Sequence, residues 1–480
     1  MSACQRRRRL YLINPRNTLV TIVSDEGSRW NRYRVWKPLG LMVLAALTPA
    51  DWDVVILDEN LGMPDYPNLP RPDLVGITAF TSQANRAYQV AAQFKVLGVP
   101  VVMGGIHATV CAKEAMTRAD AIVRGEAEGV WDRVLRDLEN GCLACRYEGG
   151  QADIDTVPVA RHDMVSAGYA FGSIQTTRGC PLNCSFCSVT AINGAHYRQR
   201  PIADVVREFK LIPEKRVLIV DDNLIGTRDE HIARAGLLFR ALAEANLDKE
   251  WICQVTINFS DHPELMELAV QAGCRGVFIG FESSAPEGLA EVGKRFNLSN
   301  NRDIRASVQR IQRHGIMVVG SFIVGLDVDQ PGVGMRVAKM AIRYGLDHLN
   351  ALFLTPLPGT RLWTQMAKEG RLDQDDFPED WKYYTLTLPV ARYRNFSLNE
   401  ISEEMLACNR HFFSKTRILA RLWRNLVHHR APIMGLIASL SCRSAIPQER
   451  EAYAHFIRSR RLPQAARTSP RHPEPCREQG

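Results

Sequence analysis

Three cysteines stand close together within the stretch from Arg178 to Val189. Cys180, Cys184 and Cys187 have the spacing C-x3-C-x2-C. Thiolates on one loop can each bind a different iron of a [4Fe–4S] cluster, because cysteine sulfur holds such clusters. One iron is then left without a nearby protein ligand, and an open coordination position can accept a substrate or cofactor. Phe186 directly precedes the last cysteine, so we expect an aromatic ring beside that open iron.

Other uses of these thiols fit the sequence less well. A zinc knuckle usually needs a second pair of Cys or His ligands, and within about thirty residues of Cys187 only His196 follows. A disulfide requires an oxidising compartment, which nothing in the sequence indicates. The spacing therefore favours an iron–sulfur cluster.

The length of 480 residues predicts two or three domains. A hydrophobic content of 46% and a charged content of 23% are typical of a soluble globular protein. Arg6–Arg9 is followed by too short an apolar run for a signal peptide. Ala431–Leu440 is far too short to span a bilayer. Without an export signal, the 12 cysteines are expected to be reduced thiols and metal ligands, and we expect a cytoplasmic protein.

The net charge of +8 is concentrated at the C-terminus. Residues 409–480 contain 14 Lys or Arg and 4 Asp or Glu, a local excess of 10 positive charges. A basic tail can bind anionic membranes or nucleic acid, or it can simply be solvated. No aromatic-rich nucleic-acid module accompanies it, so we expect no nucleic-acid partner.

The first part of the chain alternates short apolar runs with helical patterns. Alternation of this kind predicts a parallel, doubly wound Rossmann-like sheet with helices on both faces. In such sheets ligands bind beyond the carboxyl ends of the strands. The expected strands are Leu10–Asn14, Asp53–Leu57, Leu74–Thr78, Val99–Met103 and Ala121–Val123, with helices at Pro38–Leu47 and Ser82–Leu97.

Two of these strand ends are rich in glycine. Gly104 and Gly105 open the run Gly-Gly-Ile-His-Ala-Thr, and Gly125 stands in Arg-Gly-Glu-Ala-Glu. Glycine would let the backbone approach a bulky planar ligand closely. Ordinary strand-to-helix turns would have the same composition, so both interpretations stay open at this point.

A second alternating series follows a polar linker at Glu148–Asp163. Its strand–helix units predict a partial (β/α)6 barrel of the TIM type, in which chemistry lies at the C-terminal strand ends. The cysteine loop follows the first of these strands, where a catalytic loop is expected. The expected strands are Ser173–Thr176, Arg216–Val220, Trp251–Ile257, Gly276–Phe281, Met317–Val324 and Asn350–Leu354, with helices at Ile202–Leu211, His231–Ala245, Pro263–Gln271, Ile304–His314 and Gly334–Tyr344.

Polar residues also follow other strands of this barrel. Asp222 follows the second strand, Glu282 ends the fourth, and Ser321 lies in the fifth. A carboxylate at such a position could bind a ribose or an ammonium group, or it could cap the next helix. Because several strand ends show polar residues together, we favour ligand roles.

Beyond Gly370 the alternation stops and a helical C-terminal extension begins. The stretch His411–Val427 has apolar residues at helical spacing with Lys and Arg among them. It could be an amphipathic helix that closes the barrel or a helix at a membrane surface. Residues 458–480 are predicted to be disordered and basic. The expected domains are 1–147, a linker at 148–165, the barrel at 166–370 and a helical region at 371–457.

The segment Cys180-Pro-Leu-Asn-Cys184-Ser-Phe186-Cys187 resembles the signature of the radical S-adenosylmethionine (SAM) superfamily. The preceding domain resembles the cobalamin-binding domain found in one large class of these enzymes, through the runs 73–78, 104–109 and 124–128. The C-terminal part, with Leu357-Pro358-Gly359-Thr360 and Gly370-Arg371-Leu372, is similar to hopanoid methylases and to members of unassigned function.

The resemblance implies where the cofactors bind. The cysteines would hold the [4Fe–4S] cluster, and SAM would chelate its open iron. Contacts to SAM would come from Phe186 near the adenine, Glu282 near the ribose, Ser321 along the nucleoside, and Asp222. Cobalamin would lie against Thr78, Gly104, Gly105, His107, Gly125 and Glu126. The D-x-H-x-x-G motif that supplies a cobalt ligand in methionine-synthase-like domains is absent where Asn14-Pro15-Arg16 stands. The resemblance therefore permits cobalamin bound without a protein histidine, or a domain that has lost it.

The resemblance also implies the reaction. Reductive cleavage of SAM would give a 5′-deoxyadenosyl radical, and cobalamin would transfer a methyl group to an unactivated carbon of a small apolar or polycyclic substrate. Radical cyclisation, rearrangement or oxidation without methylation is the alternative, and an Fe–S electron carrier or a zinc-binding nucleic-acid module would be different classes of protein. We expect an electron donor such as flavodoxin or ferredoxin, and peripheral membrane contact through the basic C-terminal helix. No side chain is assigned as a catalytic acid or base.

Overall fold

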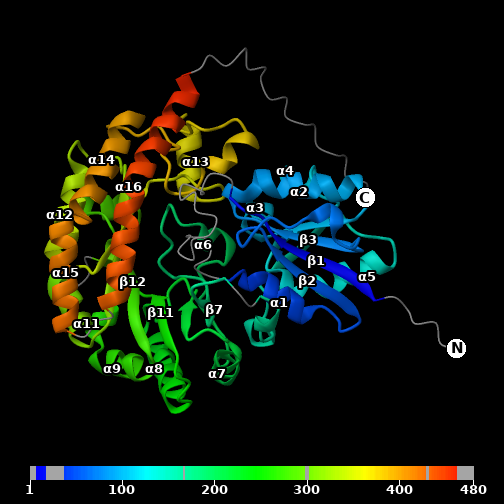
Figure 1. The fold of residues 1–480 in the computed structure, drawn as a ribbon, viewed down its shortest axis with the longest axis horizontal. Helices are drawn as coiled ribbons and strands as arrows, with labels where there is room; N and C mark the ends of the chain where they lie inside the picture. The colour runs from blue at the N-terminus through cyan, green and yellow to red at the C-terminus, as the bar shows by residue number, and fades with distance from the viewer. Residues whose placement is uncertain (1–6, 18–36, 166–167, 298–301, 429–431, 462–480) are drawn as a thin grey trace.

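A computed structural model describes residues 7–17, 37–165, 168–297, 302–428 and 432–461. Two parallel six-stranded sheets organise these residues, one from each half of the chain (Figure 1). Helices cover both faces of the first sheet and the outside of the second. The expected α/β fold class is confirmed.

The first sheet has the strand order β2-β1-β3-β4-β5-β6. Its central strands are apolar along their whole length because helices cover both faces. Residues of α1 and α5 pack on one face, and residues of α2, α3 and α4 pack on the other. The strands are β1 Arg8–Asn14, β2 Trp52–Asp58, β3 Leu74–Thr78, β4 Val101–Gly104, β5 Ala121–Gly125 and β6 Arg146–Gly150; the helices are α1 Leu39–Leu47, α2 Ala84–Val96, α3 Gly105–Val110, α4 Ala112–Met116 and α5 Trp131–Glu139.

The second sheet is the expected partial barrel, in the order β14-β13-β12-β11-β10-β7. All its neighbouring strands are parallel, so their C-terminal ends meet at one rim. Its strands are β7 Gly172–Ile174, β10 Arg216–Ile219, β11 Glu250–Gln254, β12 Cys274–Glu282, β13 Met317–Val324 and β14 His348–Phe353. Its helices are α6 Ser188–Ile192, α7 Ile202–Leu211, α8 Asp229–Glu244, α9 Pro263–Gln271, α10 Pro286–Glu291, α11 Ile304–Arg313, α12 Val333–Tyr344 and α13 Arg361–Lys368.

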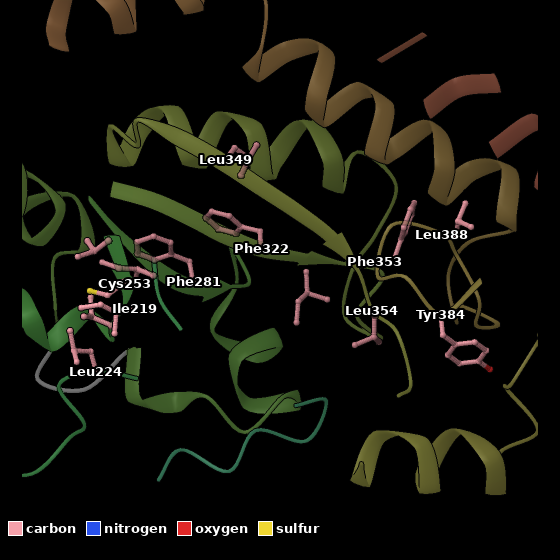
Figure 2. Packing of buried hydrophobic residues seen from close by; sticks show 14 of the residues in the cluster. Ile219, Leu224, Cys253, Phe281, Phe322, Leu349, Phe353, Leu354, Tyr384 and Leu388 are labelled. Atoms are coloured by element: carbon pink, nitrogen blue, oxygen red, sulfur yellow. The ribbon is translucent and has the colours of Figure 1, made fainter. Parts of the chain in front are cut away.

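Buried side chains of successive strands pack between the barrel sheet and the helices around it (Figure 2). Phe281 of β12 stacks near Phe322 of β13 with ring centroids 5.6 Å apart. Cys253 is fully buried among these residues, as expected for a small core side chain. Tyr384 and Leu388 extend the same core into the C-terminal region.

The C-terminal region returns to the first domain before it forms its last helices. Trp381, in the short helix η9 (Glu379–Tyr383), donates from Nε1 to both oxygens of Glu114, at 3.0 and 3.1 Å. Asn85 of α2 donates to the carbonyl of Pro378 at 2.9 Å. The chain then continues through α14 Leu398–Phe412, α15 Lys415–Val427 and α16 Pro432–Arg461. The C-terminal region therefore contacts the first domain through η9.

Some expected boundaries differ from the structure. The predicted linker begins inside β6, a strand that the sequence pattern did not reveal. The expected strand Trp251–Ile257 ends at Gln254, because Ile257 begins a 3-10 helix. The expected helix His411–Val427 is wrong as one element: α14 ends at Phe412, and Ser414 precedes a new helix.

The prediction of a disordered tail is wrong for residues 458–461, which belong to α16. The remainder of that prediction, residues 462–480, lies outside the described residues. No helix within the described ranges is long and apolar enough to cross a membrane.

The Trp381–Glu114 contact predicts a pH dependence of stability. Burial raises the pKa of Glu114, but hydrogen bonds from His107, Tyr88 and Trp381 outweigh burial and lower its pKa below the usual value of 4.5. A carboxyl with a lowered pKa in the folded state stabilises above its unfolded pKa and loses this contribution as pH falls through the folded value. At neutral pH the wild type should therefore have a higher melting temperature than the Glu114→Gln variant. The difference between the two melting temperatures should shrink below pH 4.5.

Thermal unfolding followed by circular dichroism at several pH values measures this difference. The control is Glu267→Gln, on the exposed surface of α9. A pH-independent difference between wild type and Glu114→Gln would contradict the assignment.

Candidate functional site

The cysteine loop leaves the barrel at the C-terminal end of β7. A two-stranded antiparallel ribbon, β8 (Thr177–Arg178) with β9 (Arg198–Gln199), closes the loop at its base. The backbone of Cys180 donates to the carbonyl of Gly194 at 3.4 Å, and Ser185 donates to Val292 at 3.1 Å. The loop is thus attached to its own far end and to the segment after α10.

Gly179 makes this loop possible. Its φ of +89° lies in the left-handed region, and an added Cβ would lie 2.2 Å from the carbonyl oxygen of His196. No other residue type fits without moving that backbone. The residue before Cys180 is therefore fixed by the close approach of the two chain segments.

The thiols of Cys180, Cys184 and Cys187 lie close enough to influence one another electrostatically. Burial raises the pKa of all of them, to about 11 for Cys184 and about 12 for Cys187. The buried ammonium of Lys294 opposes this rise at Cys180 and Cys184. Because a metal deprotonates a thiol that coordinates it, metal binding would oppose this effect of burial.

These residues fit a [4Fe–4S] cluster. Their donor atoms are sulfurs on one loop, which is the ligand type that iron–sulfur clusters use. Lys294 supplies a buried positive charge beside the thiolates. Within the described part of the chain, no group of three or more His, Cys, Asp or Glu surrounds a single ion. In a cluster each cysteine binds a different iron, so its ligands need not converge on one point.

Glu282 lies at the rim beside the cysteines. It ends β12 at an irregularity in the strand pairing and has a φ of +62°, which is strained for a residue with a side chain. Its carboxylate accepts from Lys294 Nζ at 2.6 Å, and both side chains are buried. Strain of this kind is common at binding sites. The helix after it begins behind Ala285 with no side-chain cap, so the capping interpretation of Glu282 is wrong.

Asp222 holds the cysteine loop from the end of β10. Its Oδ2 accepts from the backbone of Gly179 at 3.3 Å and from Asn193 Nδ2 at 3.1 Å. It does not cap α8, which begins behind Arg228 without a side-chain cap, so this capping interpretation is also wrong. Ser321 lies next to Gly280 in the strand register, and Asn350 donates to its Oγ at 3.3 Å.

The predicted cobalamin residues gather at the C-terminal edge of the first sheet. Thr78 ends β3 and meets the β4–α3 turn, where a Cβ on Gly105 would lie 2.6 Å from Thr78 Oγ1. Gly105, with φ +84°, is thus required by this close packing. A Cβ on Gly104 would only touch Val123, at 4.0 Å, so no neighbour within the described residues requires glycine there. Gly105 is thus explained by its neighbours alone, and the cobalamin role of this edge stays a prediction.

His107 points away from this edge. It is fully buried, with Nε2 2.7 Å from the Tyr88 hydroxyl and its ring edge-on to Trp381. Nδ1 has no hydrogen-bond partner within the described residues. Its cobalamin role stays a prediction, and its observed contacts belong to the junction with η9.

The edge of the first sheet faces the mouth of the barrel. Helix α3 packs against α6, the short helix that follows Cys187 (Figure 1). On the same side, a Cβ on Gly359 would lie 2.8 Å from Val110 of α3. The predicted cobalamin edge and the cysteine loop are therefore neighbours, although separate domains supply them.

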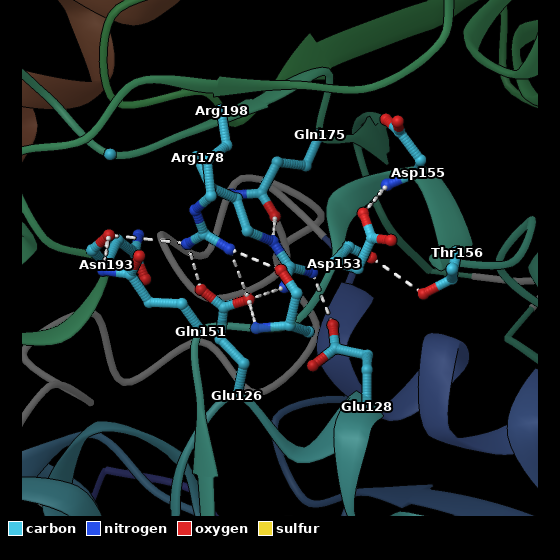
Figure 3. Close-up of polar contacts among 12 residues, drawn as sticks. Glu126, Glu128, Gln151, Asp153, Asp155, Thr156, Gln175, Arg178, Asn193 and Arg198 are labelled. Atoms are coloured by element: carbon cyan, nitrogen blue, oxygen red, sulfur yellow. Dashed lines mark hydrogen bonds and ion pairs between the residues drawn. The ribbon is translucent and has the colours of Figure 1, made fainter.

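Ion pairs fix this arrangement (Figure 3). Arg178, two residues before Cys180, contacts Glu126 at 2.6 Å and Glu128 at 2.5 Å. Arg198 donates to Glu126 from the other strand of the ribbon, at 3.0 Å from NH1. Arginine binds carboxylates in a fixed geometry. These pairs therefore set the orientation of the cysteine loop on the first domain as well as the distance between them. The carboxylate of Glu126 is thus bound by protein groups, and its role as a cobalamin contact stays a prediction.

Sequence reasoning missed Lys294, Arg198 and Asn193. Each reaches the site from a segment with no motif of its own. Arg178 lies inside the cysteine stretch, but the sequence analysis assigned it no role. Its position next to Gly179 was the one feature that could have indicated a role in the site.

Comparison with known proteins agrees with this geometry. Residues 30–135 match the B12 binding domain family, and residues 174–331 match the Radical SAM superfamily. The bacteriochlorophyllide d C-12(1)-methyltransferase of Chlorobaculum tepidum is 27% identical, over 88% of this chain and 91% of that protein. The hopanoid C-2 methylase of Rhodopseudomonas palustris is 27% identical, over 71% of this chain and 66% of that protein.

The fold is shared with a solved structure. The radical SAM methyltransferase TsrM from Kitasatospora setae, with cobalamin and a [4Fe–4S] cluster bound, has a TM-score of 0.62 and 18% identity. The match covers 93% of this chain and 99% of that chain.

The chain therefore contains a B12-binding domain followed by a radical SAM domain. These two domains support an enzyme whose cofactors are a [4Fe–4S] cluster, SAM and cobalamin. Like other members of its superfamily it uses a small-molecule substrate and a reductant. The alternative classes of electron carrier and zinc module receive no support from these matches.

From the turn at Gly179 we predict that one added methyl group will reduce cluster binding. Gly179→Ala places Cβ against His196 and should displace the loop, with loss of most of the bound iron and sulfide. Gly315→Ala is the matched control, because its φ is +81° but nothing lies within 4 Å of the new Cβ. Both variants should lose about 1–2 kcal/mol from the left-handed backbone. Iron and sulfide per chain after anaerobic reconstitution distinguish them, and full loading of Gly179→Ala would contradict the prediction.

The ion pairs at Glu126 predict a larger stability loss than an exposed pair does. Glu126→Gln leaves the buried Arg178 and Arg198 incompletely paired, which should cost about 3–5 kcal/mol. Glu148→Gln removes an exposed partner of Arg124 and should cost no more than about 1 kcal/mol. Denaturant unfolding of both variants measures the difference. Equal losses would show that the junction contributes no more than a surface ion pair.

Proposed function

We propose that this protein methylates an unactivated carbon of a small apolar or polycyclic molecule. The single observation that carries the proposal is that the cysteine loop and the predicted cobalamin edge face each other across the junction of Arg178 with Glu126. Two relatives support the substrate class, since one is named for a bacteriochlorophyllide and the other for a hopanoid. Both are polycyclic molecules.

The protein's own residues hold and orient the reacting groups. Cys180, Cys184 and Cys187 bind the cluster, Lys294 balances its charge, and Asp222 fixes the loop through Gly179. When bound, the cofactors supply reductive cleavage of SAM to a 5′-deoxyadenosyl radical and methyl transfer through cobalamin. The first domain covers the barrel rim and keeps water from a reactive radical.

We assign SAM contacts to the rim residues near the cysteines. Glu282 is proposed for the ribose, Phe186 for the adenine, and Ser321 and Asp222 for the remainder of the ligand. Support comes from the position of Glu282 next to Lys294 and from the partly buried ring of Phe186, which packs against the barrel core. The cobalamin edge would consist of Thr78, Gly104, Gly105 and Gly125.

We also propose the cellular setting. A cytoplasmic enzyme of this class would receive electrons from a small donor such as flavodoxin or ferredoxin. The excess of Lys and Arg near the C-terminus supports a peripheral contact with a membrane. The domain boundaries proposed from the sequence, 1–147 and 166–370, are retained with β6 added to the first domain.

Anaerobic reconstitution with iron, sulfide and hydroxocobalamin tests the function directly. Reduced wild type should release 5′-deoxyadenosine from SAM, and Cys184→Ala should release none, because one cluster ligand is lost. Cys145→Ser is the matched control, since that thiol is exposed and lies far from the loop in sequence. Chromatography with mass detection measures the product. Failure of fully loaded wild type to release it would overturn the assignment.

Methyl-labelled SAM then separates methyl transfer from other radical reactions. With a bacteriochlorophyllide or a hopanoid as candidate substrate, label is expected in the product. A product that forms without label would replace the methyltransferase proposal with a cyclisation, rearrangement or oxidation.

A further inference from the structure

Helix α15 exposes its apolar residues and buries a charged one. Leu419 and Trp423 are 63% and 71% exposed, and Leu426 and Val427 continue the same face toward the end of the helix. Their spacing of about one turn places them in a single stripe. We call Leu419, Trp423, Leu426 and Val427 the α15 stripe. A surface helix of a soluble domain normally turns such residues inward.

The opposite face of α15 explains why the stripe must point outward. Arg421 is 8% exposed, and its guanidinium lies 4.1 Å from the ring centroid of Phe412 while it donates to the Phe412 carbonyl at 2.9 Å. Arg424 donates to the Leu346 carbonyl and to Asp347, each at 3.2 Å. Ile418 completes this inner face. Polar and cation–π contacts thus hold the helix in one rotation on the barrel.

The outward face continues beyond α15. Ile433, in the first turn of α16, is also strongly exposed. Several large apolar side chains on neighbouring surface helices exceed the scattered exposure that soluble proteins normally show. Figure 1 shows α15 on the side of the barrel away from the first domain, so the stripe is separate from the junction described above.

The charge around the stripe is positive without exception in the sequence. Between Glu404 and Glu449 the chain has no Asp or Glu, but it has 7 Lys or Arg. Lys415 and Arg417 are exposed at the start of α15, beside the stripe. An apolar face bordered by basic residues is the pattern of a helix that lies in the interface of an anionic bilayer.

We infer that the α15 stripe docks this enzyme on an anionic lipid bilayer. The stripe would enter the boundary between headgroups and acyl chains, with Lys415 and Arg417 at the phosphates. A second copy of the chain fits less well, because a symmetric contact would bring the basic residues of both copies together. The inference deepens the membrane contact of the proposed function, on which it rests, by naming the surface and the lipid charge. A docked enzyme could take an apolar substrate directly from the bilayer.

Vesicle flotation with the full chain tests the inference without turnover. Wild type should float with vesicles of phosphatidylcholine and phosphatidylglycerol, and much less with phosphatidylcholine alone. Leu419→Ser with Trp423→Ser should weaken binding about tenfold or more, by removal of buried apolar area. Lys415→Glu with Arg417→Glu should weaken it at least about fivefold per residue, in a salt-dependent way. Leu237→Ser and Arg240→Glu, exposed positions on α8, are the matched controls.

The outcomes are distinct. The inference is supported if the α15 variants lose binding to the anionic vesicles while the α8 controls bind them as the wild type does. No flotation of wild type, or equal flotation of all variants, overturns it. A wild-type dimer in solution that Trp423→Ser dissociates also overturns it, in favour of a second copy. Release of 5′-deoxyadenosine in vesicle-free solution is measured in parallel, so failure of docking and failure of the proposed function can be told apart.

Discussion

The cysteine loop and the predicted cobalamin edge belong to separate domains, and buried ion pairs hold the two face to face. Arg178 and Arg198 extend from the base of the cysteine loop to Glu126 and Glu128 of the first domain. The arginines belong to the ribbon that closes the loop, so the same few residues shape the loop and attach it. A shift of either domain would break contacts whose partners have little access to water. The geometry of the site therefore depends on this junction more than on either domain alone.

A second attachment joins α2 and α4 of the first domain to the C-terminal region. Trp381 stacks on Phe377 with ring centroids 3.7 Å apart and reaches Glu114, while His107 and Tyr88 complete the contact. Two separated attachments resist rotation better than one. The first domain is consequently held at α4 by the C-terminal region and at β5 by the cysteine loop, with the cobalamin edge between them.

The sequence was sufficient for the architecture because periodicity and motif are local. Strand and helix alternation revealed both parallel sheets, and the C-x3-C-x2-C spacing predicted the cluster ligands. Contacts between distant segments have no local signal, so the role of Lys294 and of Arg198 could not be predicted. Glu282 was predicted at the rim, but its strained backbone and its ion pair required the fold. β6 was missed because its residues, Arg146–Gly150, are polar and glycine-rich at the edge of the sheet.

The rotation of the helices after the barrel also could not be predicted from the sequence. Apolar spacing in His411–Val427 was compatible with a core helix and with a membrane-surface helix. The break at Ser414 and the burial of Arg421 decided the rotation of α15, and neither is visible in composition. A helix can be placed from its period, but its rotation is set by what lies beneath it.

The contact between Trp381 and Glu114 joins residues 267 positions apart. Ribosomes add roughly 5–20 residues per second, so Glu114 leaves the ribosome on the order of tens of seconds before its partner exists. Through that interval the first domain can be attached to the barrel by the earlier contacts of Arg178 and Arg198 with Glu126, without the contact at Trp381.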